Sequence, residues 1–162
     1  MGDHTTGSPS APGYELPLRL LLGFRQLVDQ LHVELARQGH PHVRPMHGFA
    51  LQAVGPHGTT ASELARRLAV SKQAVAKTIE RLEELGYLER STDPRDARRR
   101  LVTVTRRGQD CLSRSGRILQ DLHGRWGEQL GSARLVELEA ALREVTGPLH
   151  LPVDTAGWLD PS

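Results

Sequence analysis

The chain has 162 residues, of which 25% are charged and 4% are aromatic, and its formal net charge is +2. This length fits one domain or a compact two-part protomer, and so few aromatic residues predict an aliphatic core built from helices. No run approaches the ~20 apolar residues of a membrane-spanning helix, and the N-terminus lacks the basic and apolar segments of a signal peptide.

The single cysteine, Cys111, excludes an intramolecular disulfide and suits a reducing cytoplasm, which is the predicted location. The sequence contains none of the short motifs H-E-x-x-H, G-x-S-x-G, the P-loop or G-x-G-x-x-G. We therefore expect a protein that is not an enzyme and that needs no cofactor.

The N-terminal part divides into a tail and a long helix. Residues 1–13 are rich in Gly, Ser, Pro and Thr, which predicts disorder. A helix is expected from about Glu15 to Gln38, with a main apolar stripe of leucines. Three further apolar residues lie off that stripe: Leu20, Phe24 and Val33. This apolar surface is larger than one packed helix face needs, and it is buried either within the monomer or against a second chain. We interpret 14–44 as a dimerisation helix.

A winged helix-turn-helix domain is predicted over 45–105. It begins with a short helix from Pro45 to Val54, whose expected buried side is Met46, Phe49, Ala50 and Ala53. Thr60 and Glu63 then form a capping-box pattern that starts a second helix, whose expected inner face is Leu64, Ala65 and Leu68. Only Ala69 and Val70 separate this helix from Ser71, so the next helix must meet it at a sharp angle, as in a helix-turn-helix.

The following helix, Ser71 to Leu85, is the predicted recognition helix. Ser71 is a suitable N-cap, and Gly86 is a suitable residue after the C-terminus. An apolar stripe repeats with helical spacing at Val75, Ile79 and Leu82. The opposite face carries Gln73, Lys77, Glu80, Arg81 and Glu84. Gln and Lys can bond base edges in a major groove, and the only lysines of the chain, Lys72 and Lys77, lie in this helix.

A basic hairpin follows the recognition helix. We expect strands over 87–90 and 101–105 and a polar loop over 91–100, which carries Arg95, Arg98, Arg99 and Arg100. An arginine-rich loop is often only a solvated surface, but next to a helix-turn-helix it predicts a wing that reaches phosphates or the minor groove. From Ser62 to Arg107 there are 12 Lys and Arg against 7 Asp and Glu, so this segment is more basic than the rest.

The C-terminal part is expected to return to the first helix. A long helix is predicted from Arg106 to about Gly127, and a last one from Ala133 to Val145 with Ser132 as its N-cap. We assign 106–150 to the dimerisation region and 151–162, with Trp158, to a tail. The predicted fold class is mainly α with a small β-hairpin wing.

The stretch from Thr60 to Gly108 resembles the DNA-binding core of the MarR family of transcriptional regulators. The wing motif D-P-x-D-x-R is present at 93–98, and Leu101, Thr105 and Gly108 follow it. The resemblance implies that Asp96 positions the wing arginines and that Arg98 enters the minor groove. It also implies that the start of the recognition helix contacts an operator. The predicted DNA-contacting residues are Ser71, Lys72, Gln73, Ala74, Lys77, Thr78, Arg81, Arg95, Arg98, Arg99 and Arg100.

In this family the terminal helices of two chains interlock, so the resemblance implies a homodimer that presents two recognition helices ~34 Å apart. We predict a regulator of double-stranded DNA with a near-palindromic operator, a repressor rather than an activator. A small-molecule effector between the terminal helices and the DNA lobe is a candidate for releasing it. No membrane partner is expected.

Two alternatives stay open. His40, His42, His47 and His57 would serve a zinc-responsive regulator and Cys111 a redox-responsive one, but exposed histidines and a core cysteine are the competing interpretations, and we assign no metal ligand. Otherwise, the chain is a helical module whose basic loop binds RNA or an acidic protein. The scarcity of aromatic side chains for base stacking disfavours single-stranded RNA.

Overall fold

The computed structural model describes residues 12–147, in which six helices and one antiparallel hairpin follow one another. The predicted fold class, mainly α with a small hairpin, is confirmed. The elements are α1 (Glu15–Arg37), α2 (Pro45–Val54), α3 (Ala61–Leu68), α4 (Lys72–Glu84), β1 (Leu88–Asp93), β2 (Asp96–Val104), α5 (Arg106–Leu130) and α6 (Ser132–Thr146). The predicted tail 151–162 and all but two residues of the predicted tail 1–13 lie outside the described residues.

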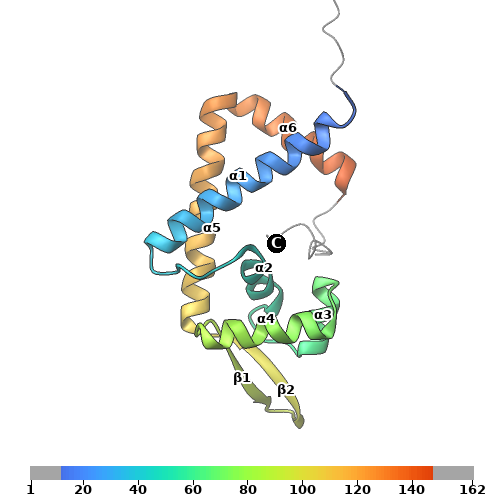
Figure 1. Cartoon of the computed structure of the whole chain (residues 1–162), viewed down its shortest axis with the longest axis vertical. Helices are drawn as coiled ribbons and strands as arrows, with labels where there is room; N and C mark the ends of the chain where they lie inside the picture. The colour runs from blue at the N-terminus through green and yellow to red at the C-terminus, as the bar shows by residue number, and fades with distance from the viewer. Residues whose placement is uncertain (1–11, 148–162) are drawn as a thin grey trace, which may run out of the picture.

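The molecule has two ends joined by α5 (Figure 1). At one end, α2, α3, α4 and the hairpin form the helix-turn-helix and its wing. From the base of the hairpin, α5 runs to the other end, where α1 and α6 lie. The expectation that a long helix connects the hairpin to the first helix is thus confirmed. None of the helices within 12–147 combines the length and the apolar character that crossing a membrane requires.

Hydroxyl side chains start three of the helices. Thr60 caps α3 by accepting the backbone N–H of Glu63 at 3.2 Å, and Ser71 caps α4 by accepting that of Ala74 at 3.1 Å. Thr105 caps α5 in the same way, at 3.1 Å from the N–H of Gly108. The capping box at Thr60 is only half formed, because the Glu63 carboxylate bonds Arg66 and Arg67 instead.

The predicted N-cap of α6 is wrong. Ser132 already lies inside α6, and the residue before it, Gly131, has the non-helical backbone with φ +86°. No side chain caps this helix. A glycine at Gly131 reaches positive φ without the steric cost that other residues meet, so the break falls one residue earlier than the serine predicted.

The core lies where α2, α3 and α4 meet the base of the hairpin and α5. The predicted inner residues of α3 and α4 are buried: Leu64, Ala65, Leu68, Val75, Ile79 and Leu82. The predicted buried side of α2 was partly wrong, since Met46, Phe49 and Ala53 are only half-buried. His47, Leu51 and Val54 are buried instead, together with Ala50. Because α2 packs against α3, α4, α5 and β2, a single stripe does not describe its buried surface.

The predicted wing loop is also too long. The strands continue through most of 91–100, and only Pro94 and Arg95 lie between them. Thr92 pairs with Arg100, whereas Asp93 pairs with Asp96, so the register shifts next to the turn. A third backbone segment supports the hairpin, because Thr59 exchanges two backbone hydrogen bonds with Val102, at 3.0 and 2.7 Å. The polar composition of this segment thus belongs to exposed strands.

Candidate nucleic-acid interface

The recognition helix α4 has one buried and one exposed face, as its sequence predicts. Val75, Ile79 and Leu82 are buried, while Gln73 and Lys77 are exposed. The helix start is exposed as well, including Ser71, Lys72 and Ala74. With a free polar face and small neighbouring residues, this half of the helix can approach the edges of base pairs. The orphan N–H groups of its first turn also favour a nearby phosphate.

The polar groups of α4 differ in how free they are to bind a ligand. Thr78 is half-buried, and its hydroxyl donates to the carbonyl oxygen of Ala74 at 3.1 Å. Arg81 is exposed but forms an ion pair with Glu84 at 2.8 Å. Within the described residues, Lys72 and Lys77 have no ion pair. The two lysines are therefore the unneutralised cations of this helix, and Arg81 must exchange Glu84 for a phosphate before it can bind one.

Two aspartates shape the tip of the wing. Asp93 accepts the backbone N–H of Arg95 at 2.9 Å, and Asp96 accepts that of Arg98 at 3.0 Å. Such side-chain acceptors two residues before a donor stabilise tight turns. Asp96 thus contacts the backbone of one wing arginine, and Asp93, for which the sequence predicted no such role, does the same for another. Asp93 also pairs with the guanidinium of Arg99 at 3.5 Å.

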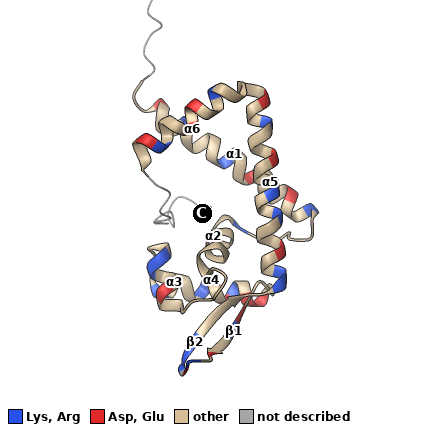
Figure 2. Cartoon of the chain, turned by 180° about the vertical axis from the view of Figure 1, so that it is seen from behind, with Lys and Arg blue, Asp and Glu red and all other residues tan. Residues whose placement is uncertain are grey.

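The positive charges of this end lie on the surface. Arg95, Arg98, Arg99 and Arg100 are all exposed, and Figure 2 shows Lys and Arg at the tip of the wing and on α3. The acidic residues of α4 lie in its C-terminal half, at Glu80, Glu83 and Glu84. The start of α4 and the wing therefore form the part of this surface that is best suited to bind a polyanion. The acidic end of α4 is poorly suited to bind one.

A cavity of about 940 Å³ separates α1 from the recognition helix. Its wall includes Lys77, Thr78 and Arg81 of α4, so part of the predicted DNA-binding face also faces this space. Further charged or titratable residues come from α1, from α2 and from the residue before α2: Arg25, Asp29, His32, Arg44 and His47. Sequence reasoning named only His47 among them, as a candidate metal ligand, and missed that they line one cavity, because they match no motif.

The histidines do not share one environment. His42 and His57 are exposed, but His40 and His47 are buried, so the interpretation of all four as exposed was wrong. Burial lowers the pKa of His47, and the positive charges of Arg44 and Arg81 lower it further. Within 12–147, no group of three or more potential metal ligands comes together.

Cys111 lies in the core, as a cysteine on an apolar stripe predicts. Burial raises the pKa of its thiol. A thiol is nucleophilic as the thiolate, so both the burial and the raised pKa disfavour oxidation.

A helix-turn-helix followed by an arginine-tipped hairpin defines the class of winged helix-turn-helix DNA-binding proteins. Residues 43–99 match the model of the MarR family. The predicted resemblance to this family is thus confirmed for this segment of the chain. Comparison with curated proteins finds no significant relative of the whole sequence.

Solved structures share the fold over most of the chain. Streptococcus pneumoniae FabT in complex with DNA has a TM-score of 0.69 at 17% identity, covering 82% of this chain and 93% of that one. Wild-type MarR from E. coli, in its apo form, has a TM-score of 0.63 at 23% identity, covering 83% and 97%. CouR from Rhodococcus jostii, bound to p-coumaroyl-CoA, has a TM-score of 0.60 at 18% identity, covering 83% and 93%.

Proposed function

We propose that this protein is a homodimeric repressor that binds a near-palindromic site in double-stranded DNA. The observation that carries the proposal is the joint exposure of the α4 face, with Gln73 and Lys77, and of the arginine tip of the wing. Gln73 and Lys77 read base edges, while Arg98 enters the minor groove and the other wing arginines contact phosphates. The structurally similar FabT was solved in complex with DNA, which supports DNA binding by this fold.

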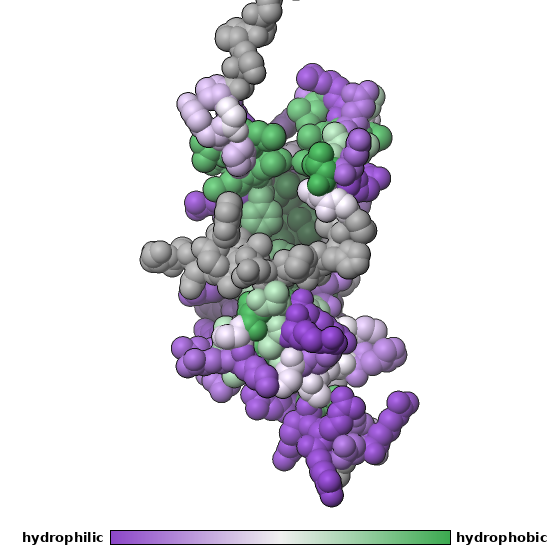
Figure 3. All heavy atoms as spheres, turned by 90° about the vertical axis from the view of Figure 1, so that its right-hand side faces the viewer, coloured by the Kyte–Doolittle hydropathy of each residue, from purple (hydrophilic) through white to green (hydrophobic). Residues whose placement is uncertain are grey.

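The dimer is proposed because the protomer leaves a large apolar surface uncovered. The first half of α1 exposes Leu16, Leu18, Leu20 and Leu22, which are between 44% and 66% accessible. The last helix, α6, adds Val136 and Val145 at 62% and 79%. Figure 3 shows hydrophobic residues gathered at the end of the molecule where α1 and α6 lie, opposite the hydrophilic wing. Apolar surface of this extent typically marks an interface, and a second copy of the same helices covers it.

In the proposed dimer, two copies of α4 enter successive major grooves ~34 Å apart and the protein covers a promoter. An effector that holds the two helices at another spacing would release the DNA. The cavity between α1 and α4 is the proposed effector site. Its wall combines apolar residues such as Phe24 and Met46 with four cationic ones, Arg25, Arg44, Lys77 and Arg81, against one acidic residue, Asp29. This lining favours an amphipathic anion, which shifts the equilibrium only if it binds the DNA-free spacing more tightly.

The DNA proposal is tested by selecting bound genomic fragments with the purified protein and measuring their affinity by fluorescence anisotropy. We expect a palindromic consensus and an affinity that falls steeply with salt, because many contacts are to phosphate. RNA of the same sequence should compete poorly. Equal affinity for RNA and duplex DNA, or the absence of any preferred DNA sequence, would contradict the proposal.

The dimer is tested separately by light scattering on a size-exclusion column. Leu22→Glu places a charge in the exposed apolar face and should give a monomer with weakened operator binding. The matched control is Gln26→Glu, at an exposed polar position of the same helix. A monomeric wild-type protein, or a dimer that survives Leu22→Glu unchanged, would count against this interface.

The effector site is tested with the fluorescent amphipathic anion anilinonaphthalene sulfonate. Binding should brighten the probe and reduce operator affinity, and Arg44→Gln should weaken both effects. The exposed Arg117 on α5 provides the control variant, Arg117→Gln. If the probe binds without changing operator affinity, the cavity is not an effector site.

A further inference from the structure

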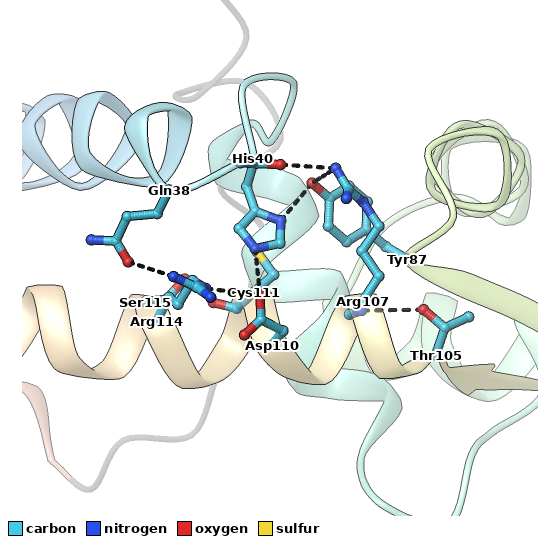
Figure 4. Close-up of polar contacts among 11 residues, drawn as sticks. Gln38, His40, Tyr87, Thr105, Arg107, Asp110, Cys111, Arg114 and Ser115 are labelled. Carbon is cyan, nitrogen blue, oxygen red and sulfur yellow. Dashed lines mark hydrogen bonds and ion pairs between the residues drawn. The ribbon is translucent and has the colours of Figure 1, made fainter.

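Three segments that are distant in the sequence meet at a polar cluster on the side of the DNA lobe nearest α5, in which His40 and Tyr87 are buried and the Asp110 side chain is 44% exposed (Figure 4). His40 comes from the loop after α1, Tyr87 directly follows the recognition helix and its terminal Gly86, and Asp110 lies in the first turns of α5. The His40 and Tyr87 residues are only 3% and 1% exposed. None of the three lines the cavity between α1 and α4.

Two hydrogen bonds connect the cluster through the imidazole ring. Nδ1 of His40 lies 2.9 Å from the hydroxyl of Tyr87, and Nε2 lies 3.0 Å from Oδ2 of Asp110. The Arg114 guanidinium and His40 hold the pKa of the Asp110 carboxyl below its usual range, so this group only accepts. In the neutral ring Nε2 therefore donates to Asp110, and Nδ1 accepts the proton of the Tyr87 hydroxyl.

Two arginines of α5 enclose this chain of bonds. Arg107 donates to the backbone oxygen of Gly39 at 2.9 Å and to the Tyr87 hydroxyl at 3.4 Å, and it stacks over the Tyr87 ring at 4.9 Å. Arg114 donates to Asp110 at 2.8 Å and to the side chain of Gln38 at 3.3 Å. The end of α1 is thus attached to α5 and to Tyr87 mainly by side chains.

The end of the recognition helix is attached to α5 in a different way, by two bonds from Thr105 to backbone oxygens. Thr105 donates its hydroxyl to the oxygen of Gly86 at 2.6 Å and its N–H to the oxygen of Tyr87 at 3.0 Å. These bonds fix α4 to the start of α5. The orientation of α1 relative to that unit depends on His40, its two partners and the flanking arginines, because residues 38–40 connect α1 to the cluster.

We propose that His40, Tyr87 and Asp110 form a positioning junction that sets the angle between α1 and the recognition helix, and thereby the operator affinity. This inference rests on the proposed function, because α1 carries the dimer contacts and α4 reads the DNA. The cavity between α1 and α4 opens along the same pair of helices. A change in its width therefore has to be accommodated at the junction, which holds α1 at one end.

The first test uses variants that remove a hydrogen bond and keep the shape of the side chain. Tyr87→Phe and Asp110→Leu, which has no side-chain acceptor, should each lower operator affinity roughly fivefold or more, as coupling between sites typically does. The slope of affinity against salt should stay unchanged, because no phosphate contact is lost. The matched controls are Tyr14→Phe, at a tyrosine that is 68% exposed, and Asp121→Leu, at an exposed position of α5. Both should bind as wild type.

The second measurement separates positioning from mere stability. Spin labels at Gln26→Cys on α1 and Glu80→Cys on α4 report the distance between the two helices, because both sites are exposed and Cys111 is buried. An excess of unlabelled chain restricts the measurement to one protomer. We expect Tyr87→Phe to broaden or shift the distance distribution and Tyr14→Phe to leave it unchanged.

The outcomes are distinguishable. An unchanged distance distribution in Tyr87→Phe overturns the junction whether or not the protein binds DNA. A lowered melting temperature with unchanged affinity and distance assigns the cluster to stability alone and also overturns it. A wild-type protein that binds no duplex DNA defeats the proposed function, while the distances still decide whether the junction sets the angle.

Discussion

Gly108 of α5 lies so close to the carbonyl oxygen of Tyr87 that a Cβ atom at position 108 would overlap it. It would also overlap a methyl group of Val104. This close contact between α5 and Tyr87 allows Thr105 to cap α5 and to form a hydrogen bond to the end of the recognition helix at the same time. A glycine is therefore required here by contact with neighbouring atoms, although the position is helical.

Gly108→Ala should consequently destabilise the protein by about 1–3 kcal/mol, as overpacking against a fixed backbone does. Gly116→Ala on the same helix is the control, because nothing lies within 4 Å of a Cβ there. Since alanine is the better helix former, Gly116→Ala should stabilise by up to ~1 kcal/mol. Urea unfolding measures both. Equal effects of the two variants would show that α5 does not pack on Tyr87 as described.

The two parts of the proposed DNA interface should respond differently to truncation. Lys77→Ala, on the exposed face of α4, should change the preferred operator sequence, because it removes a contact to base edges. Arg98→Ala, in the wing, should weaken binding to all sequences more evenly and reduce the salt dependence. Anisotropy titrations against the consensus and single-base variants measure this. If neither substitution alters DNA affinity, the assigned interface is wrong.

The Asp96 carboxylate should matter for the wing rather than for the fold. Asp96→Ala removes the acceptor for the Arg98 N–H, which typically costs about 0.5–1.5 kcal/mol locally and should weaken operator binding by up to ~10-fold. Asp96→Asn keeps a side-chain oxygen and should restore much of the affinity. Global stability should stay within about 0.5 kcal/mol in both variants. Equal binding by Asp96→Ala and wild type would remove the positioning role.

His47 should make the protein less stable in mild acid. Its pKa is lowered by burial and by Arg44 and Arg81, so the unfolded chain binds this proton more readily. The free energy of unfolding should therefore begin to fall as the pH drops through about 6.5, the usual histidine pKa, and the loss is complete below the lowered pKa. His47→Asn should reduce this decline between pH 7.5 and pH 5.5, while the exposed His42→Asn should keep it. An equal decline in both variants contradicts the assignment.

Cys111 should react slowly in the folded protein. Its burial and raised pKa predict that a thiol reagent at pH 8 modifies it far more slowly than in urea. Operator affinity should also survive treatment with peroxide. Rapid modification of the native protein, or a loss of DNA binding that a thiol reductant reverses, would favour the redox-responsive alternative.

Local signals predicted much of the fold. The 3.6-residue spacing of Val75, Ile79 and Leu82, and the caps at Thr60 and Ser71, depend on residues within one or two turns of each other. The residues of the wing motif at 93–98 are also close together in the sequence, so the motif could be identified without knowing the fold. The boundaries failed where two local signals competed, as at Gly131 and Ser132, and where polar residues formed exposed strands around Pro94.

The sequence by itself determined the order of the helices, the faces of α3 and α4, and the basic character of the wing, because each follows from the periodicity or chemistry of a short segment. Only the tertiary structure decided that His40 and His47 are buried. The partners of His40 are 47 and 70 residues away from it. No local pattern encodes such pairs, since burial and hydrogen bonding depend on how α1, α4 and α5 pack, and the same holds for the cationic cavity between α1 and α4.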